Sequence, residues 1–240
     1  MSLLKLHFRY LFGKRNILLL SVVLLLTGIG FFLSARPFSS PTEHLVNNKA
    51  YFHNYFSNCL LLTKILQLLL VSFVMGMSFT PQSDSYNILY LSYKRMRLPF
   101  ILSKLILLTI VGVSIGFLFS FLYFAIGFLS ASWFVFKISH LEAFVLLSLI
   151  SIYYGLMSCV LVFLLKSPLV SVIAYIMYLA SEFFRSLDAS RFNNAVQVLF
   201  PSLVATPDGV KLPYGALHVL VLIGFFSFLG SYLYLHFDLS

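Results

Sequence analysis

The chain has 240 residues, of which 60% are hydrophobic and 10% are charged, and its formal net charge at pH 7 is +9. An ordinary soluble domain has about a quarter of its residues charged, so this composition excludes a water-soluble globular protein. Cations that flank membrane helices and contact anionic lipid headgroups account for the positive charge. We therefore expect membrane lipid as a partner, and nucleic acid is not needed as one.

The first segment is short and basic. Residues 3–12 place Lys5 and Arg9 one helical turn apart among Leu, Phe and Tyr side chains, and Gly13 interrupts the pattern. Two interpretations remain open: a short amphipathic helix in the inner membrane face, or a basic tail that only orients the next helix. The apolar run that follows is too long for a secretory signal, so we predict that it is retained.

Six long apolar runs follow one another and predict a single all-α membrane domain over residues 1–240. Most runs reach the ~20 residues that cross a hydrocarbon core. No run carries Asp or Glu in its middle third, so the sequence offers no obvious carboxylate for coupling transport to protons or sodium. The predicted spans are about 17–34, 58–80, 101–128, 141–165, 168–184 and 215–236.

The distribution of cations predicts the orientation. With a cytoplasmic N-terminus, nine Lys and Arg residues fall in short inner segments beside helix ends, six are spread over longer outer loops, and Lys64 within the second span completes the sixteen. The positive-inside rule then places both termini in the cytoplasm. The two cysteines, Cys59 and Cys159, fall at different depths, so we expect no disulfide.

The segment between the second and third runs carries the most specific pattern. Pro81 ends the second run, Asp84 or Ser85 can cap a new helix, and Pro99 is expected to close it before the third span. Tyrosine and arginine side chains recur on one face of that helix at spacings of four, three and four. Such a helix suits contact with a soluble motor, whereas the alternative is an interfacial tyrosine belt with cations that only fix topology. The residues concerned are Tyr86, Tyr90, Tyr93 and Arg97, with Lys94 and Arg95 between them.

A few polar or small residues lie within the apolar runs. Lys64 and Gln67 share one face of the second run and mark a possible substrate path, although a lysine near a membrane boundary can also extend outward to water. Glu182 and Arg185 are three residues apart and are placed to pair with each other. In the third run, residues 112 and 116 form a GxxxG pattern, which predicts close packing against another helix of the same chain.

The sequence lacks the motifs of the common catalytic and metal sites. Gly13-Lys14 is the nearest approach to a phosphate-binding loop, but it lacks the upstream glycine and the following Ser or Thr. HExxH, GxSxG and clustered Cys and His are also absent. We therefore expect no catalytic and no metal-ligating residue, and any ATP hydrolysis would take place on another polypeptide.

The order of these parts resembles the permease subunits of ABC-2-type transporters. The resemblance rests on the basic N-terminal segment, the stretch SYNILYLSYKRMRLPFILSKLILL at 85–108 and the stretch VQVLFPSLVA at 196–205. It implies a helical elbow carrying Lys5 and Arg9, six spans, and an outer, partly embedded segment before the last span. It also implies a coupling helix that docks on an ATPase, formed or flanked by Tyr86, Tyr90, Tyr93, Lys94, Arg95 and Arg97, with a second contact at Lys166 and Ser167.

The same resemblance implies a function and partners. The chain would be a transport subunit in a bacterial plasma membrane, paired with a second copy or a paralogue and with two ATPase subunits that bind ATP and Mg. Its cargo would be a hydrophobic or amphipathic peptide, exported by alternating exposure of a cavity between permeases. The alternatives are a lipid or drug exporter permease, an ATP-independent secondary transporter, and a membrane-embedded enzyme.

Overall fold

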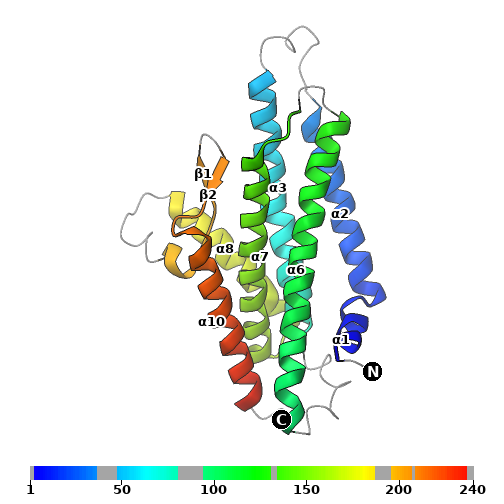
Figure 1. Cartoon of the computed structure of the whole chain (residues 1–240), viewed down its shortest axis with the longest axis vertical. Helices are drawn as coiled ribbons and strands as arrows, with labels where there is room; N and C mark the ends of the chain where they lie inside the picture. The colour runs from blue at the N-terminus through cyan, green and yellow to red at the C-terminus, as the bar shows by residue number, and fades with distance from the viewer. Residues whose placement is uncertain are drawn as a thin grey trace.

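The computed structural model describes residues 3–36, 48–80, 94–130, 134–186, 196–206 and 209–236. Its long helices run side by side along one axis (Figure 1). Helix α1 (Leu3–Leu11) and the last turn of α10 (Gly215–His236) lie at the same end of the bundle, which we call the terminal end. The other end is the opposite end.

Five helices within the described residues are long and apolar enough to cross a membrane, as expected of a multi-pass membrane protein. A sixth apolar helix, α8 (Ser171–Ser186), follows the 3₁₀ turn η2 (Pro168–Val170) and has only 16 residues. The fold is therefore mostly helical, with helices that could span a membrane, while the count of six spans stays a prediction. The five long helices are α2 (Lys14–Ala35), α3 (Asn48–Met77), α6 (Lys94–Ser130), α7 (Ile138–Leu165) and α10.

Helix α7 forms the centre of the bundle and contacts α3, α6, α8 and α10. Every residue from 150 to 160 is buried. The GxxxG pair of α6 faces this helix, because a Cβ on Gly116 would lie 2.6 Å from the Ser148 Cβ, and one on Gly112 would lie 2.7 Å from the Ile152 Cγ1. The motif thus serves packing inside this chain, where small residues let two helices approach closely.

Helix α1 is amphipathic and packs against α6. Its His7 and Leu11 side chains are buried, whereas Lys5, Phe8 and Arg9 are exposed. The chain turns at Gly13, whose extended backbone caps the start of α2. Lys5 and Arg9 therefore lie on the surface at the terminal end.

Helix α6 corrects the expected boundary at Pro99. The helix begins at Lys94 and continues through Pro99 to Ser130. Pro99 lies in the second turn of the described helix, so its missing N–H removes a single hydrogen bond near the start and does not end the helix. The basic residues Lys94, Arg95 and Arg97 consequently belong to the same rigid element as the third span.

A small β-hairpin follows the outer segment and was not expected from the sequence. Residues 196–199 form one helical turn, and strands β1 (Val204–Thr206) and β2 (Gly209–Lys211) then pair antiparallel, with Val204 opposite Lys211. The segment expected to be partly embedded is thus a short helix and a hairpin placed between α8 and α10 (Figure 1).

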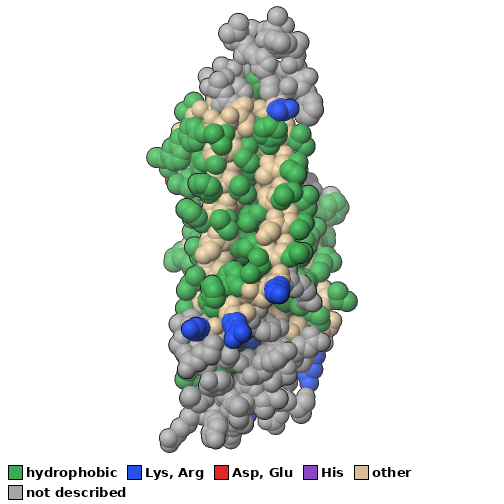
Figure 2. Space-filling model, turned by 90° about the vertical axis from the view of Figure 1, so that its right-hand side faces the viewer, with side chains coloured by type: hydrophobic (Ala, Val, Ile, Leu, Met, Phe, Trp, Pro, Cys, Tyr) green, Lys and Arg blue, Asp and Glu red, His purple; other side chains and the backbone are tan. Residues whose placement is uncertain are grey.

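The flanking helices leave most of their apolar surface uncovered. Only 11% of the most apolar window of α2 is buried, and only 6% of that of α10. Figure 2 shows the side of the molecule on the right of Figure 1 as a continuous apolar band with Lys and Arg only at its two ends. Such a band is the surface that a hydrocarbon core requires.

Candidate functional site

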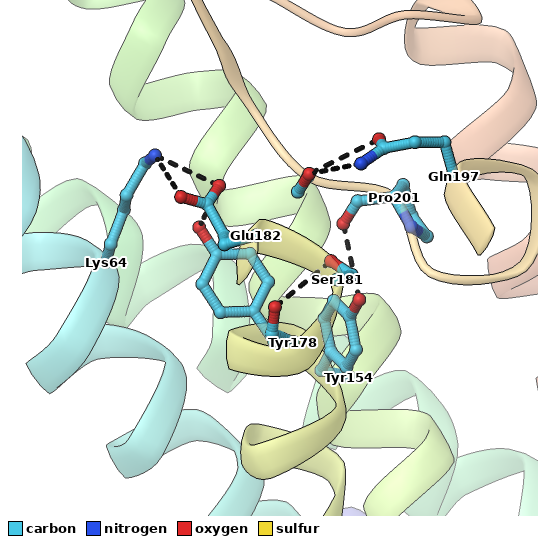
Figure 3. A network of polar contacts seen from close by, with 8 residues as sticks. Lys64, Tyr154, Tyr178, Ser181, Glu182, Gln197 and Pro201 are labelled. Atoms are coloured by element: carbon cyan, nitrogen blue, oxygen red, sulfur yellow. Dashed lines mark hydrogen bonds and ion pairs between the residues drawn. The ribbon is translucent and has the colours of Figure 1, made fainter. Parts of the chain in front are cut away.

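A partly buried ion pair links two helices of the bundle. Lys64 Nζ of α3 donates to both carboxylate oxygens of Glu182 on α8, each at 3.1 Å. The exposed fractions of the two side chains are 14% and 24%. The Tyr178 hydroxyl donates a third hydrogen bond to Glu182 Oε1 at 3.1 Å, and the groups point toward one another (Figure 3). We call Lys64, Tyr178 and Glu182 the α3–α8 polar cluster.

The pattern of α8 explains why these groups face inward. Apolar side chains such as Ile176 and Phe183 are exposed, whereas Tyr178 and Ser181 are buried against the bundle. Tyr178 and Glu182 are four residues apart, so they share a face of the helix. Helix α8 therefore presents its apolar side outward and its polar side to α3 and α7.

Lys64 was expected either to extend toward water or to face a substrate, and Glu182 was expected to pair with Arg185. The structure pairs Lys64 with Glu182, while the Arg185 side chain lies outside the described residues. A charge within an apolar helix is stabilised by an opposite charge and by hydrogen bonds. The clue in the sequence was the presence of two opposite charges in separate apolar runs, but their partnership spans 118 positions.

Gln67 lies one turn further along α3 and contacts different neighbours. Its side chain is fully buried, and Nε2 lies 3.4 Å from Ser148 Oγ of α7. Gln67 Oε1 has no hydrogen-bond partner among the described residues. The two residues of the predicted substrate path thus lie about one turn apart on α3, Lys64 against α8 and Gln67 against α7.

The outer segment is anchored beside the α3–α8 polar cluster. The Tyr153 hydroxyl donates to the Leu199 carbonyl, and the Tyr154 hydroxyl donates to the Pro201 carbonyl at 3.4 Å. Within the segment, Gln197 and Ser202 exchange hydrogen bonds at 3.0 and 3.3 Å. The two tyrosine contacts hold the outer segment against α7 (Figure 3).

A second polar centre lies at the terminal end. Lys104 of α6 is 3% exposed, and its Nζ lies 4.4 Å from the centroid of the Phe79 ring, with the Phe100 and Tyr234 rings at 5.7 and 5.9 Å. These aromatic faces favour a cation. His7 of α1 packs edge-on against Phe100 at 4.6 Å. This cluster joins α1, α6 and α10 and the turn after α3.

Burial of His7 changes its proton affinity. The pKa of His7 is lowered to about 4, first by burial and then by the positive charge of Lys104, while a hydrogen bond with the Phe100 backbone acts in the opposite direction. His7 is therefore neutral at pH 7. Neither His7 nor the ring cluster around Lys104 was singled out from the sequence, because their partners are far apart along the chain.

The residues predicted to contact an ATPase are described only in part. Tyr86, Tyr90 and Tyr93 lie outside the described residues, as do the side chains of Lys94 and Arg95. Arg97 is half-buried in the first turn of α6.

The second predicted contact is a turn at the terminal end. Helix α7 ends at Leu165, and η2 begins at Pro168. Lys166, between them, is exposed and adopts a left-handed backbone with φ of 52°. Ser167 is half-buried and caps the start of η2.

The described residues contain no group of three or more His, Cys, Asp or Glu side chains that would hold a metal ion. No protein-family model matches the chain, and no curated protein is similar to it in sequence. The assignment of a function therefore rests on the arrangement of the helices and polar groups.

Proposed function

We propose that this chain is the membrane-spanning permease subunit of an ATP-driven exporter. It lies in the bacterial plasma membrane with its terminal end in the cytoplasm, and it works with a second copy or a paralogue and with two ATPase subunits. Its cargo is a hydrophobic or amphipathic peptide. A lipid or drug is the alternative cargo for the same machine.

The observation that carries the proposal is the length and continuity of α6. At 1.5 Å per residue its 37 residues extend about 55 Å, well beyond the ~30 Å of a hydrocarbon core. The helix starts with the basic residues 94–97 at the terminal end and reaches the opposite end while packing against α1, α2, α7 and α10. A force applied at its start is therefore delivered directly to the centre of the bundle.

The terminal end offers two further contacts for a soluble partner. The Lys166–Ser167 turn connects the central helix α7 to α8, which carries the α3–α8 polar cluster. Movement of this turn would change the position of α8 relative to α3, and the Lys64–Glu182 pair joins these two helices. Closure of the ATPase subunits would thus change the exposure of the α3–α8 polar cluster.

The proposal is tested by reconstituting the chain in vesicles with and without the ATPase encoded nearest to it. We expect ATP-driven transport of a labelled hydrophobic peptide only when both proteins are present. Replacing Tyr90, Tyr93 and Arg97 together with Ala should abolish transport while the protein remains inserted. The control replaces Lys211, which is exposed on β2, and should retain transport. Unchanged transport by the triple variant would remove the coupling assignment.

The α3–α8 polar cluster supports a second candidate, an ATP-independent secondary transporter. Glu182 supplies an intramembrane carboxylate of the kind that couples transport to a proton or sodium gradient. Under this function the chain alone would accumulate its cargo when a gradient is imposed, and Glu182→Gln would abolish that uptake. Transport that requires the ATPase and persists in Glu182→Gln excludes it.

A further inference from the structure

Helices α6 and α10 enclose an apolar groove at the terminal end of the bundle. The groove has a volume of about 600 Å³. Residues Leu98 to Ile110 of α6 form one wall, and Ser227 to Leu235 of α10 form the other. Because the two helices are antiparallel neighbours, Leu98 and Leu235 mark the mouth of the groove and Ile110 and Ser227 its deep end.

The walls offer little to a polar ligand. Leu102, Ile106 and Phe228 supply apolar surface. Two of the lining hydroxyls are already engaged within their own helices, since Thr109 Oγ1 donates to the Leu105 carbonyl at 3.0 Å and Ser231 Oγ donates to the Ser227 carbonyl at 2.8 Å. A peptide backbone would leave its N–H and C=O groups without partners here, which is costly in an apolar environment.

The dimensions of the groove match one lipid chain. From Leu98 to Ile110 the α6 axis rises about 18 Å, close to the ~15 Å of one leaflet. The groove therefore has the length of one acyl chain of that leaflet.

The mouth of the groove lies at the start of α6, where the sequence is rich in Lys and Arg. Helix α6 begins with Lys94, Arg95 and Arg97, immediately before Leu98. Arginine binds phosphate oxygens through its planar guanidinium, and cations at a membrane surface attract anionic headgroups. The phosphate of a lipid whose chain fills the groove would lie at the level of these residues.

We propose that the α6–α10 groove binds an anionic phospholipid of the leaflet at the terminal end, with an acyl chain between the helices and the phosphate at the start of α6. This lipid holds α10, most of whose apolar surface is otherwise uncovered, against α6. The lipid phosphate would use cations that the proposed function assigns to the ATPase contact, so lipid binding is measured on the chain without an ATPase.

The experiment measures lipid selectivity at the groove by fluorescence quenching. Trp133 is replaced by Phe, and Phe228→Trp places a single reporter in the groove of the otherwise intact chain. The protein is reconstituted in vesicles that contain brominated phosphatidylglycerol or brominated phosphatidylcholine with identical chains. We expect phosphatidylglycerol to associate with the groove roughly fivefold more strongly, as about 1 kcal/mol from one cation near the surface would give.

Two matched controls separate groove binding from general attraction to the surface. A reporter at Val22→Trp lies on the exposed side of α2, about two turns from the terminal end of its helix, as Phe228 does in α10, and should show no preference. Replacing Lys94, Arg95 and Arg97 with Gln should remove the preference at the groove. Removing the same number of charges from Lys5, Arg9 and Lys14 should leave it unchanged.

Several outcomes would overturn the proposal. Equal quenching by the two lipids at Phe228→Trp would remove the anionic site. An equal loss of preference in both triple variants would show a general surface effect. If neither lipid quenches the reporter at high protein density and quenching appears only when the protein is diluted in the vesicles, a second copy of the chain covers the groove. These results are independent of transport, so the proposed function is not decided by them.

Discussion

The charged side chains inside the bundle are each held by specific contacts. Lys64 reaches the Glu182 carboxylate, which also accepts from the Tyr178 hydroxyl, and Lys104 lies among aromatic rings. Glu182 lies on a different helix from Lys64, and the rings around Lys104 come from α6 itself, from α10 and from the turn after α3, so a single substitution affects the packing of more than one element. Polar side chains at these positions consequently fix the register of α3 against α8 and of α6 against its neighbours.

We expect Lys64 and Glu182 to be strongly coupled in stability. Lys64→Met or Glu182→Gln alone removes one partner of a partly buried pair and should lower the free energy of unfolding by roughly 1–3 kcal/mol. The double variant should lose much less than the sum, because neither charge is then left alone. Denaturant unfolding of the four proteins in the same detergent measures the coupling, and strictly additive losses would contradict it.

The stability of the terminal end should fall in mild acid through His7. The pKa of His7 is about 4 in the folded chain and near 6.5 when unfolded, so the unfolded state binds more protons between these values. The contribution of neutral, buried His7 to the free energy of unfolding is complete above pH 6.5 and is lost as the pH falls toward 4. His7→Leu cannot titrate, so the difference in unfolding free energy between the native chain and this variant should change from pH 7 to pH 5. A constant difference would show that His7 is accessible to protons in the folded state.

The elements differ in what each contributes. Helix α7 supplies the buried centre, α6 the continuous length, and α8 a polar inner face with an apolar outer one. The contact between α6 and α7 depends on small residues, because Gly116 allows Ser148 to approach and leaves room for Gln67 Nε2. The same contact determines how closely α6 packs against the central helix α7.

Substitutions at two glycines distinguish the effect of helix packing on stability from the effect of helix propensity. Gly116→Ala introduces a Cβ that would lie 2.6 Å from the Ser148 Cβ, so we expect a loss of about 1–3 kcal/mol in the free energy of unfolding. Gly224→Ala on α10 meets no atom within 4 Å and should be neutral or stabilise by a few tenths of a kcal/mol up to about 1 kcal/mol. Unfolding measurements on the two variants test this, and equal effects would show that α6 and α7 are not in close contact at Gly116.

The sequence predicts the apolar elements well and their interactions poorly. Long apolar runs predict α2, α7 and α10 within a few residues of their limits, whereas α3 begins at Asn48 and α6 at Lys94, well before the predicted 58 and 101. Length and hydropathy predict that a membrane helix exists, but not where its polar ends begin. Pro99 was misread as a boundary, since proline near a helix start costs little. The Lys64–Glu182 pair and the ring cluster around Lys104 depend on which helices are neighbours, and no local pattern encodes that arrangement.

At the scale of the whole molecule, the orientation of the bundle decides which end meets a soluble partner. The terminal end carries α1, the start of α6 and the Lys166–Ser167 turn, whereas the β-hairpin lies toward the opposite end (Figure 1). The excess of cations in the segments of the terminal end predicts that this end faces the cytoplasm.

Cysteine labelling tests this orientation in intact cells. Cys59 and Cys159 are both buried, so a membrane-impermeant maleimide should react weakly with the native chain. Lys137→Cys and Lys211→Cys, both at exposed positions, should be labelled from outside. Lys5→Cys and Lys166→Cys should react only after the cells are permeabilised. Labelling of the second pair in intact cells would invert the topology and exclude the proposed ATPase contact.

The nearly bare surfaces of α2 and α10 have a consequence for how the sequence of this protein can vary. Lipid tails accept any apolar side chain without regard to its shape, so the lipid-facing positions of these two helices need only remain apolar. The tightly enclosed stretch of α7 from 150 to 160 must keep its shapes as well. Among diverging copies of this chain, the lipid-facing positions of α2 and α10 would exchange freely between leucine, valine, isoleucine and phenylalanine. The buried positions of α7 would change slowly.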